Sequence, residues 1–87
     1  MTYAIYLSPR SRRALEVDLP EAVAAACIEF IFGPLAENPH RVGKSLRDEL
    51  AGFYAARRGE FRVIYTIHED RVAVRVISIR HRRDVYS

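Results

Sequence analysis

Two neighbouring segments of this sequence alternate between apolar and polar side chains, and this pattern constrains the fold more than any other. Residues 61–68 (FRVIYTIH) and 71–79 (RVAVRVISI) place an apolar residue at nearly every second position, as a β-strand with one buried face does. The polar pair Glu69 and Asp70 separates them, which predicts an antiparallel hairpin. The face expected to be buried carries Phe61, Val63, Tyr65, Ile67, Val72, Val74 and Val76. A face this apolar has to be covered, so we expect helices to pack on it.

The rest of the chain supplies those helices and more strand. Residues 3–7 alternate like a short strand, and Ser8 with Pro9 then predicts a helix that runs to about Leu19. A second, alanine-rich helix is expected from Pro20 to Gly33 and Pro34. Residues 37–44 are typical of a loop, and residues 53–57 predict a further strand. The expected fold is α+β: an N-terminal strand, two helices, then antiparallel strands in one sheet with the helices on one face.

Length and composition limit the class of protein. With 87 residues, the sequence predicts one domain spanning 1–87. Cys27 is the only cysteine and lies in an apolar stretch, so we expect a buried thiol, no disulfide and no thiolate metal site. The sequence shows no signal peptide and no membrane-spanning run, which predicts a cytoplasmic protein. Nothing in it calls for a cofactor.

Positive charge gathers in the second half of the chain. Residues 1–40 carry three basic and five acidic side chains, whereas residues 41–87 carry eleven basic and six acidic ones. Thirteen of the fourteen cations are arginine, whose planar fork of donors matches phosphate oxygens. This asymmetry favours a nucleic-acid partner or an acidic protein. A GC-rich genome is the alternative explanation for so much arginine.

The predicted hairpin determines where those arginines meet. With Glu69 and Asp70 at the tip, Tyr65 is expected opposite Val74 and Val63 opposite Val76. The opposite, open face then mixes basic and apolar side chains: Arg62, Ile64, Thr66, Arg75 and Ile77. The same register gathers a cationic cluster at one end of the sheet, which contains Arg57, Arg58, Arg62, His81 and Arg82, beside Tyr86.

Such a cluster fits phosphodiester chemistry. Clustered cations stabilise the charge that grows on phosphate oxygens in the transition state. RNA supplies its own nucleophile, the 2′-hydroxyl, so its cleavage needs a base, an acid and charge stabilisation but no metal. Arginine does not readily release a proton near neutral pH, which leaves His81, Glu60 and Tyr86 as candidates for proton transfer.

Several stretches resemble a known family. RRGEFRVIY at 57–65, VISI at 76–79 and HRRDVY at 81–86, with Gly43-Lys44 and the leucines Leu46 and Leu50, are similar to the RelE branch of the RelE/ParE toxin superfamily. These are small bacterial toxins of type II toxin–antitoxin pairs. The resemblance implies a metal-free mRNA interferase that enters the ribosomal A site and cuts the codon there. It also implies an acidic, RelB-like antitoxin that forms a heteromer with the toxin.

The resemblance implies roles for individual residues. Arg62 would contact the scissile phosphate, and Arg82 would stabilise the transition state. His81 would act as general acid or base, and Tyr86 would stack on or orient a base. We expect Lys44, Arg57 and Arg58 to contact RNA or ribosome without taking part in the chemistry.

Other interpretations remain open for these residues. Relatives of the RelE type carry two lysines on the strand before the conserved arginine, where this chain has Phe53 and Ala55, so the usual base is missing. His81 is equally consistent with a surface histidine, and Tyr86 with a ring packed on the sheet edge. ParE-like relatives use the same fold to poison DNA gyrase, which is the alternative function. The mixed open face predicts that the antitoxin wraps across it.

Overall fold

The computed structural model describes residues 2–81, which form one mixed β-sheet with helices on one face. The strands of this part are β1 (Ala4–Leu7), β2 (Lys44–Ser45), β3 (Tyr54–Arg58), β4 (Phe61–His68) and β5 (Ala73–His81). The helical segments are α1 (Pro9–Arg13), η1 (Ala14–Asp18), α2 (Glu21–Phe30), η2 (Ile31–Leu35), α3 (Pro39–Val42) and η3 (Asp48–Leu50). The predicted α+β fold is confirmed.

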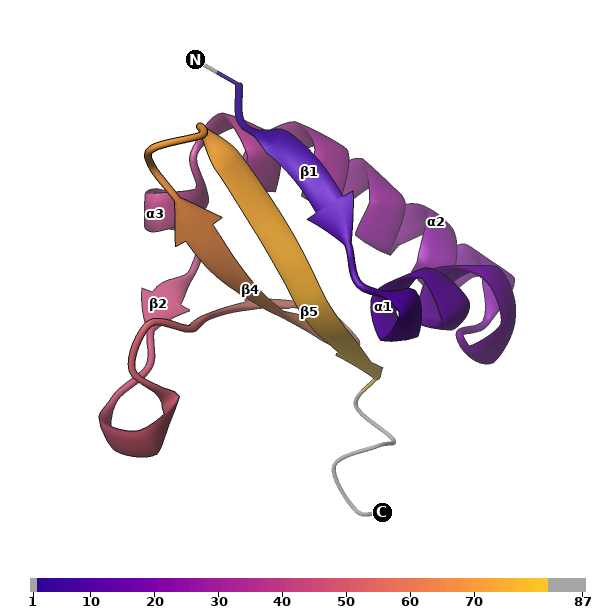
Figure 1. The fold of residues 1–87 in the computed structure, drawn as a ribbon. Helices are drawn as coiled ribbons and strands as arrows, with labels where there is room; N and C mark the ends of the chain where they lie inside the picture. Colours follow the sequence, from indigo (N-terminus) through magenta and orange to yellow (C-terminus); the bar gives the residue numbers. More distant parts are fainter. Residues whose placement is uncertain (1, 82–87) are drawn as a thin grey trace.

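The sheet order brings the first and the last of these strands together. Its order is β1-β5-β4-β3-β2, so β5 lies between β1 and β4 (Figure 1). β1 pairs with β5 in parallel, with Ala4 opposite Ala73, whereas the other pairs are antiparallel. A parallel pair needs a crossover connection, and the helices between β1 and β2 provide part of it.

Both predicted helices form, and the second extends further than expected. Ser8 caps α1 by accepting a hydrogen bond from the backbone N–H of Ser11, and Pro9 occupies the first turn. The first helical segment ends at Asp18, close to the predicted Leu19. The second was predicted to end at Gly33 and Pro34, but the π-helical turn η2 carries the chain through both to Leu35. A widened turn accommodates a proline, which lacks the N–H that a regular α-helix uses there.

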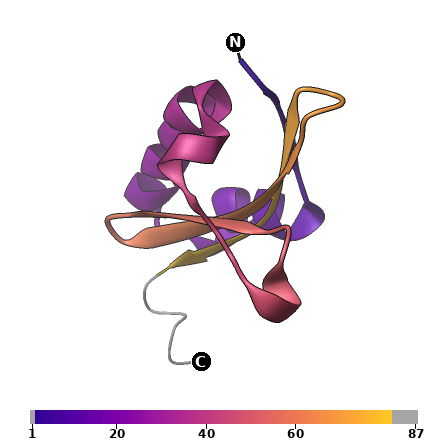
Figure 2. The ribbon, with the colours of Figure 1, turned by 90° about the vertical axis from the view of Figure 1, so that its left-hand side faces the viewer.

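The core lies between α2–η2 and the inner face of the sheet. In Figure 2 the α2 and α3 helices lie on one side of the sheet and the turn containing η3 lies on the other. The side chains buried between the layers include Val23, Cys27, Phe30, Ile31, Leu35, Val63, Tyr65, Val74 and Val76. The predicted inner positions of β4 and β5 therefore do pack in this core, except for Val72, which lies in the turn before β5. Cys27 is a buried free thiol as expected.

The hairpin register differs from the prediction by two residues near the turn. Tyr65 pairs with Val76 and Ile67 with Val74, because the connection uses four residues, 69–72, and not two. A two-residue hairpin turn favours residues that adopt positive φ, such as Asn and Gly, and Glu69 with Asp70 does not provide them. The longer turn needs one positive φ, at Val72 (49°).

A β-bulge changes the register again further along β5. Ile64 pairs with Ser78 while Tyr65 pairs with Val76, so Ile77 is an extra residue. α1 binds the carbonyl groups at this point: the Ser8 hydroxyl donates to the Ile77 carbonyl at 2.7 Å, and the Ser11 hydroxyl donates to the Val76 carbonyl at 3.2 Å. Beyond the bulge, Arg80 pairs with Arg62 and His81 with Phe61. The extra residue therefore exchanges the faces on which residues 78–81 lie.

The predicted loop 37–44 is partly ordered. It contains α3 and ends in β2, which pairs with β3 through Lys44 opposite Ala55 and Ser45 opposite Tyr54. Gly43 packs directly over the hydroxyl of Tyr65, and this hydroxyl donates to the Pro39 carbonyl at 2.6 Å. The contact places Lys44 on the sheet face opposite Tyr65, because successive residues of a strand point to opposite faces.

Candidate nucleic-acid interface

Three arginines lie in register across three strands on the face of the sheet away from α2, which we call the open face. Arg57 of β3 pairs with Arg62 of β4, and Arg62 pairs with Arg80 of β5. We call these three residues the arginine row. All three are exposed. Neighbouring strands are about 5 Å apart, so the backbone positions of the row span about 10 Å.

This arrangement works against the stability of the sheet. Like charges directly opposite one another on paired strands are destabilising, and the row contains two such pairs. Within residues 2–81, none of the three guanidinium groups forms an ion pair with a carboxylate; the ion pairs of this part involve other cations. A bound polyanion would relieve this repulsion, because each guanidinium offers a fork of donors to phosphate oxygens.

Beside the row, the open face carries one lysine and otherwise uncharged side chains. The next pairs along the strands join Lys44 to Ala55, Ala55 to Ile64 and Ile64 to Ser78. Lys44 is exposed, whereas Ile64 is half-buried and Ser78 is buried. The predicted basic and apolar mixture is therefore present, with Arg75 paired to Thr66 further along.

Two residues predicted for the cationic cluster lie on the other side of the sheet. His81 was expected level with Arg58 beside the arginines, but the bulge turns it to the helix face, where it is buried. Its Nε2 lies 3.7 Å from a carboxylate oxygen of Glu60. Arg58 pairs with Phe61 and holds its guanidinium 4.7 Å from the centre of the Phe30 ring. The predicted grouping of His81 and Arg58 with Arg62 is wrong.

Arg80 joins the row although it was absent from the candidate residues. A regular hairpin with the observed turn would place residue 80 opposite Phe61, on the helix face. The consecutive apolar residues Val76 and Ile77 interrupt the alternation at the bulge that reverses this. The residues Val72, Ala73 and Val74 interrupt it as well without a bulge, so the pattern alone does not locate the extra residue. Bulges are frequent beside functional sites because they redirect side chains.

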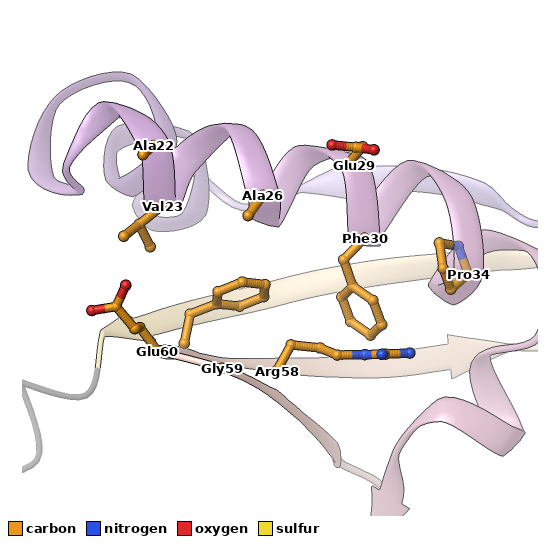
Figure 3. Close-up of a pocket in the computed structure, with 10 residues that line it drawn as sticks. Ala22, Val23, Ala26, Glu29, Phe30, Pro34, Arg58, Gly59 and Glu60 are labelled. Carbon is orange, nitrogen blue, oxygen red and sulfur yellow. The ribbon is translucent and has the colours of Figure 1, made fainter.

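The helix face also carries an apolar groove between α2 and the turn that joins β3 to β4. Figure 3 shows Phe30 and Arg58 facing each other across it, with Glu60 near one end. The groove has a volume of about 550 Å³. Its lining includes Ala22, Val23, Ala26, Glu29, Pro34, Gly59 and Phe61. It opens on the side of the sheet opposite the arginine row, so the two surfaces are separate.

Residues 2–81 show neither a cluster of metal-ligating side chains nor a membrane-spanning helix. This part of the chain holds no group of three or more His, Cys, Asp or Glu side chains that could bind a metal ion. It also contains no helix long and apolar enough to span a membrane.

Comparisons with known proteins identify the family. Residues 11–86 match the family model described as the ParE toxin of the type II toxin–antitoxin system parDE. The chain is also 46% identical, over 84 residues, to Toxin RelE of Mycobacterium tuberculosis, and the match covers 97% of this chain and 86% of that protein. The chain belongs to the RelE/ParE superfamily of type II toxins.

Further members of the RelE/ParE superfamily agree with this assignment. Toxin RelG of M. tuberculosis is 43% identical over 86 residues, which are 99% of this chain and 98% of that protein. A chain in the crystal structure of the toxin–antitoxin complex RelBE2 from M. tuberculosis superposes with a TM-score of 0.90 at 41% identity, and covers 94% of this chain and 100% of the other.

Two of the residues that the RelE resemblance selected lie outside the described part. Arg82 is the next residue of the sequence after His81, where β5 ends, and Tyr86 comes four positions later. Phe53 precedes β3, and Ala55 lies in β3 opposite Lys44. The described part of the site in this RelE/ParE toxin therefore consists of the arginine row, Lys44 and the small side chains between them.

Proposed function

We propose that this toxin is a ribosome-dependent endoribonuclease that cuts mRNA in the A site. In this proposal the 2′-hydroxyl of the codon attacks the adjacent phosphorus, so the reaction needs no external nucleophile. The arginine row binds the phosphate and stabilises the negative charge that develops on its oxygens. The relatives named RelE and RelG support this activity over others found on the same fold.

The observation that carries the proposal is the register of the arginine row. Three guanidinium groups opposite one another cost stability, and sequences rarely retain such a cost without use. A row about 10 Å long is long enough to contact the scissile phosphate and a neighbouring one. Because the row runs across the strands, the RNA backbone in this proposal also runs across the strands, along the row.

We assign roles to the residues accordingly. Arg62, at the centre of the row, contacts the scissile phosphate, while Arg57 and Arg80 hold the backbone on either side. Arg82 stabilises the transition state and Tyr86 orients a base, as the family resemblance implies. The proposal gives no chemical role to His81, because its ring is buried on the opposite face.

We also propose that an acidic, RelB-like antitoxin binds the toxin and blocks this face. The superposable chain of the RelBE2 structure belongs to a toxin–antitoxin complex. An acidic segment across the open face would neutralise Arg62 and Arg75 and would cover Ile64, which is half-buried in the isolated toxin.

The test is to map cuts in a translated message with purified ribosomes. We compare the wild type with Arg62→Ala, Arg80→Ala and Arg82→Ala, and use Arg71→Ala as the matched control. Arg71 is exposed at the β4–β5 turn, far from the row, and lies 3.7 Å from Asp70. Loss of one charge-stabilising donor typically lowers a rate about 100- to 1000-fold, so we expect losses of this size in the first three variants and none in Arg71→Ala.

Other outcomes would contradict the proposal. Cuts outside A-site codons, cuts unaffected by the three arginine substitutions, or cuts that persist with excess antitoxin would each do so. The ParE family model that matches residues 11–86 supports a second candidate, a gyrase poison. Intact mRNA together with gyrase-dependent DNA breaks would establish this second function and reject the first.

A further inference from the structure

RNA cleavage by the 2′-hydroxyl requires a proton for the oxygen that leaves. The departing 5′-oxygen is a poor leaving group unless a general acid protonates it, and such an acid typically contributes 100- to 10,000-fold, as an order of magnitude. The arginine row cannot supply this proton, because a guanidinium does not deprotonate in proteins. The proposed function therefore needs a second kind of group near the row.

Among residues 2–81, few proton donors lie on the open face. His68 is at the far end of β4, six residues from Arg62 and so about 20 Å away along the strand, where it contacts the hydroxyl of Thr66 at 2.9 Å. Tyr6 lies on β1 opposite Arg75, also far from the row. His81 and Glu60 meet away from this face. Lys44 remains, and it is the only lysine of the chain.

The strand pairing places Lys44 next to the row. Lys44 is directly opposite Ala55, and Arg57 is the next residue of β3 on the same face. A residue and its diagonal cross-strand neighbour lie about 7–8 Å apart at the backbone, within reach of long side chains. Ala55 carries only a methyl group, so the four-carbon stem of Lys44 has room to lie across it toward β4.

The position of Lys44 is fixed by contacts of the residues before and after it. Gly43 packs over the Tyr65 hydroxyl with no room for a side chain, and the Leu46 N–H donates to the Phe53 carbonyl at 2.8 Å. These contacts hold the two-residue strand β2 on both sides of Lys44. Within the described part of the chain, no carboxylate forms an ion pair with Lys44. Lys44 is an exposed residue.

We propose that Lys44 is the general acid of the cleavage reaction. This inference depends on the proposed nuclease function. The 2′-oxygen forms a bond to phosphorus as its proton passes to water, and the bond between phosphorus and the 5′-oxygen breaks. The Lys44 ammonium gives a proton to that oxygen and is then reprotonated by solvent. The products are a 2′,3′-cyclic phosphate and a 5′-hydroxyl.

The test compares two leaving groups on programmed ribosomes under single-turnover conditions. One mRNA is unmodified, and the other carries sulfur in place of the 5′-oxygen at the cut site, which leaves without protonation. For Lys44→Ala we expect a loss of about 100-fold or more on the oxygen substrate and less than about 10-fold on the sulfur substrate. Lys44→Arg keeps the positive charge, but its guanidinium group cannot donate a proton. We therefore expect it to show the same pattern as Lys44→Ala.

A relocated amine provides a second readout. The double variant Lys44→Ala/Ala55→Lys moves the ammonium group to the directly paired position. We expect it to cut the oxygen substrate at least about 10-fold faster than Lys44→Ala does. Arg47→Ala, which removes an exposed cation three residues away, is the matched control and should cut at the wild-type rate.

Three results would overturn the inference. Lys44→Ala could cut the oxygen substrate at the wild-type rate, Lys44→Arg could retain full activity, or the sulfur substrate could be slowed as much as the oxygen one. Each leaves the nuclease function standing if the wild type still cuts. A wild type that cuts neither substrate would instead reject the proposed function, and the role of Lys44 with it.

Discussion

Among the four glycines, Gly43 has the least room for a side chain, because the Tyr65 hydroxyl lies against it. A Cβ atom on Gly43 would lie 2.1 Å from the Tyr65 hydroxyl oxygen and 3.0 Å from the Ala55 carbonyl oxygen. Tyr65 is fully buried and stacks on Tyr54, with ring centres 5.6 Å apart. Burial raises the pKa of Tyr65 to about 12, so its hydroxyl remains a donor to the Pro39 carbonyl. This one residue thus joins α3, β2 and β4.

Substitution of Gly43 by alanine tests this contact. We expect Gly43→Ala to lower the free energy of unfolding by about 1–3 kcal/mol, because the new methyl group displaces the Tyr65 hydroxyl from its acceptor. Urea denaturation measures the change. Gly33→Ala is the control, since a Cβ there meets nothing within 4 Å; it should be neutral or stabilising by up to about 1 kcal/mol. Equal effects in the two variants would contradict the explanation.

Among the secondary-structure elements, α1 has the most direct effect on the site although it does not belong to it. Its capping residue Ser8 accepts from the Ser11 N–H at 3.1 Å and donates to the Ile77 carbonyl of the bulge at 2.7 Å. The bulge in turn places Arg80 opposite Arg62. The start of a short helix therefore helps to determine which side chains reach the open face.

We expect Ser8→Ala to cost about 1–3 kcal/mol of unfolding free energy. The substitution removes a helix cap, worth about 0.5–2 kcal/mol, and the hydrogen bond to the bulge, worth about 1 kcal/mol. Thermal and urea denaturation would both report it. Ser45→Ala serves as the control, because Ser45 is exposed on β2 and should change stability by less than about 0.5 kcal/mol. If Ser8→Ala has the same free energy of unfolding as the wild type, the helix cap and the hydrogen bond to the bulge do not contribute to stability.

The same elements show what could be predicted from sequence. Period-two alternation identified β4 and β5 and their buried face, and capping residues identified where α1 begins. The register failed because it depends on turn geometry and on the extra residue Ile77, and neither is encoded in a periodic pattern. Because of this error, His81 was predicted on the wrong face of the sheet, and Arg80 was not predicted to lie at the site. β2 was missed because two residues are too few to show any period, although they carry Lys44.

At the scale of the whole molecule, one small polar cluster joins three distant parts of the chain. The hydroxyl of Tyr3 donates to the carboxylate of Glu69 at 3.1 Å, and Nε2 of His40 contacts the same carboxylate. The cluster ties the start of the chain, the α3 helix and the β4–β5 turn together at the end of the sheet remote from the arginine row. The hydrogen bond from His40 lowers the pKa of Glu69 below its usual value of 4.5.

This lowered pKa predicts how stability depends on pH. Because Glu69 is more acidic in the folded state, its contribution is present above about pH 4.5 and is lost as the pH falls through its folded-state pKa. We expect Glu69→Gln to be less stable than the wild type near neutral pH, with a difference that shrinks in acid. Melting temperatures between about pH 3 and pH 7 measure this, with Glu29→Gln, an exposed carboxylate of α2, as the control. A difference that stays constant across that range would contradict the role of the cluster.

The position of β5 has a consequence for the biosynthesis of this toxin. β5 lies between β1 and β4, yet it follows every other described element along the chain. A nascent polypeptide that has not yet released β5 from the ribosome lacks the strand on which β1 and β4 both pair. It also lacks Arg80, which is one of the three residues of the arginine row. The central pairing of the sheet and the complete arginine row therefore form only after β5 has left the ribosome, later than every other described element.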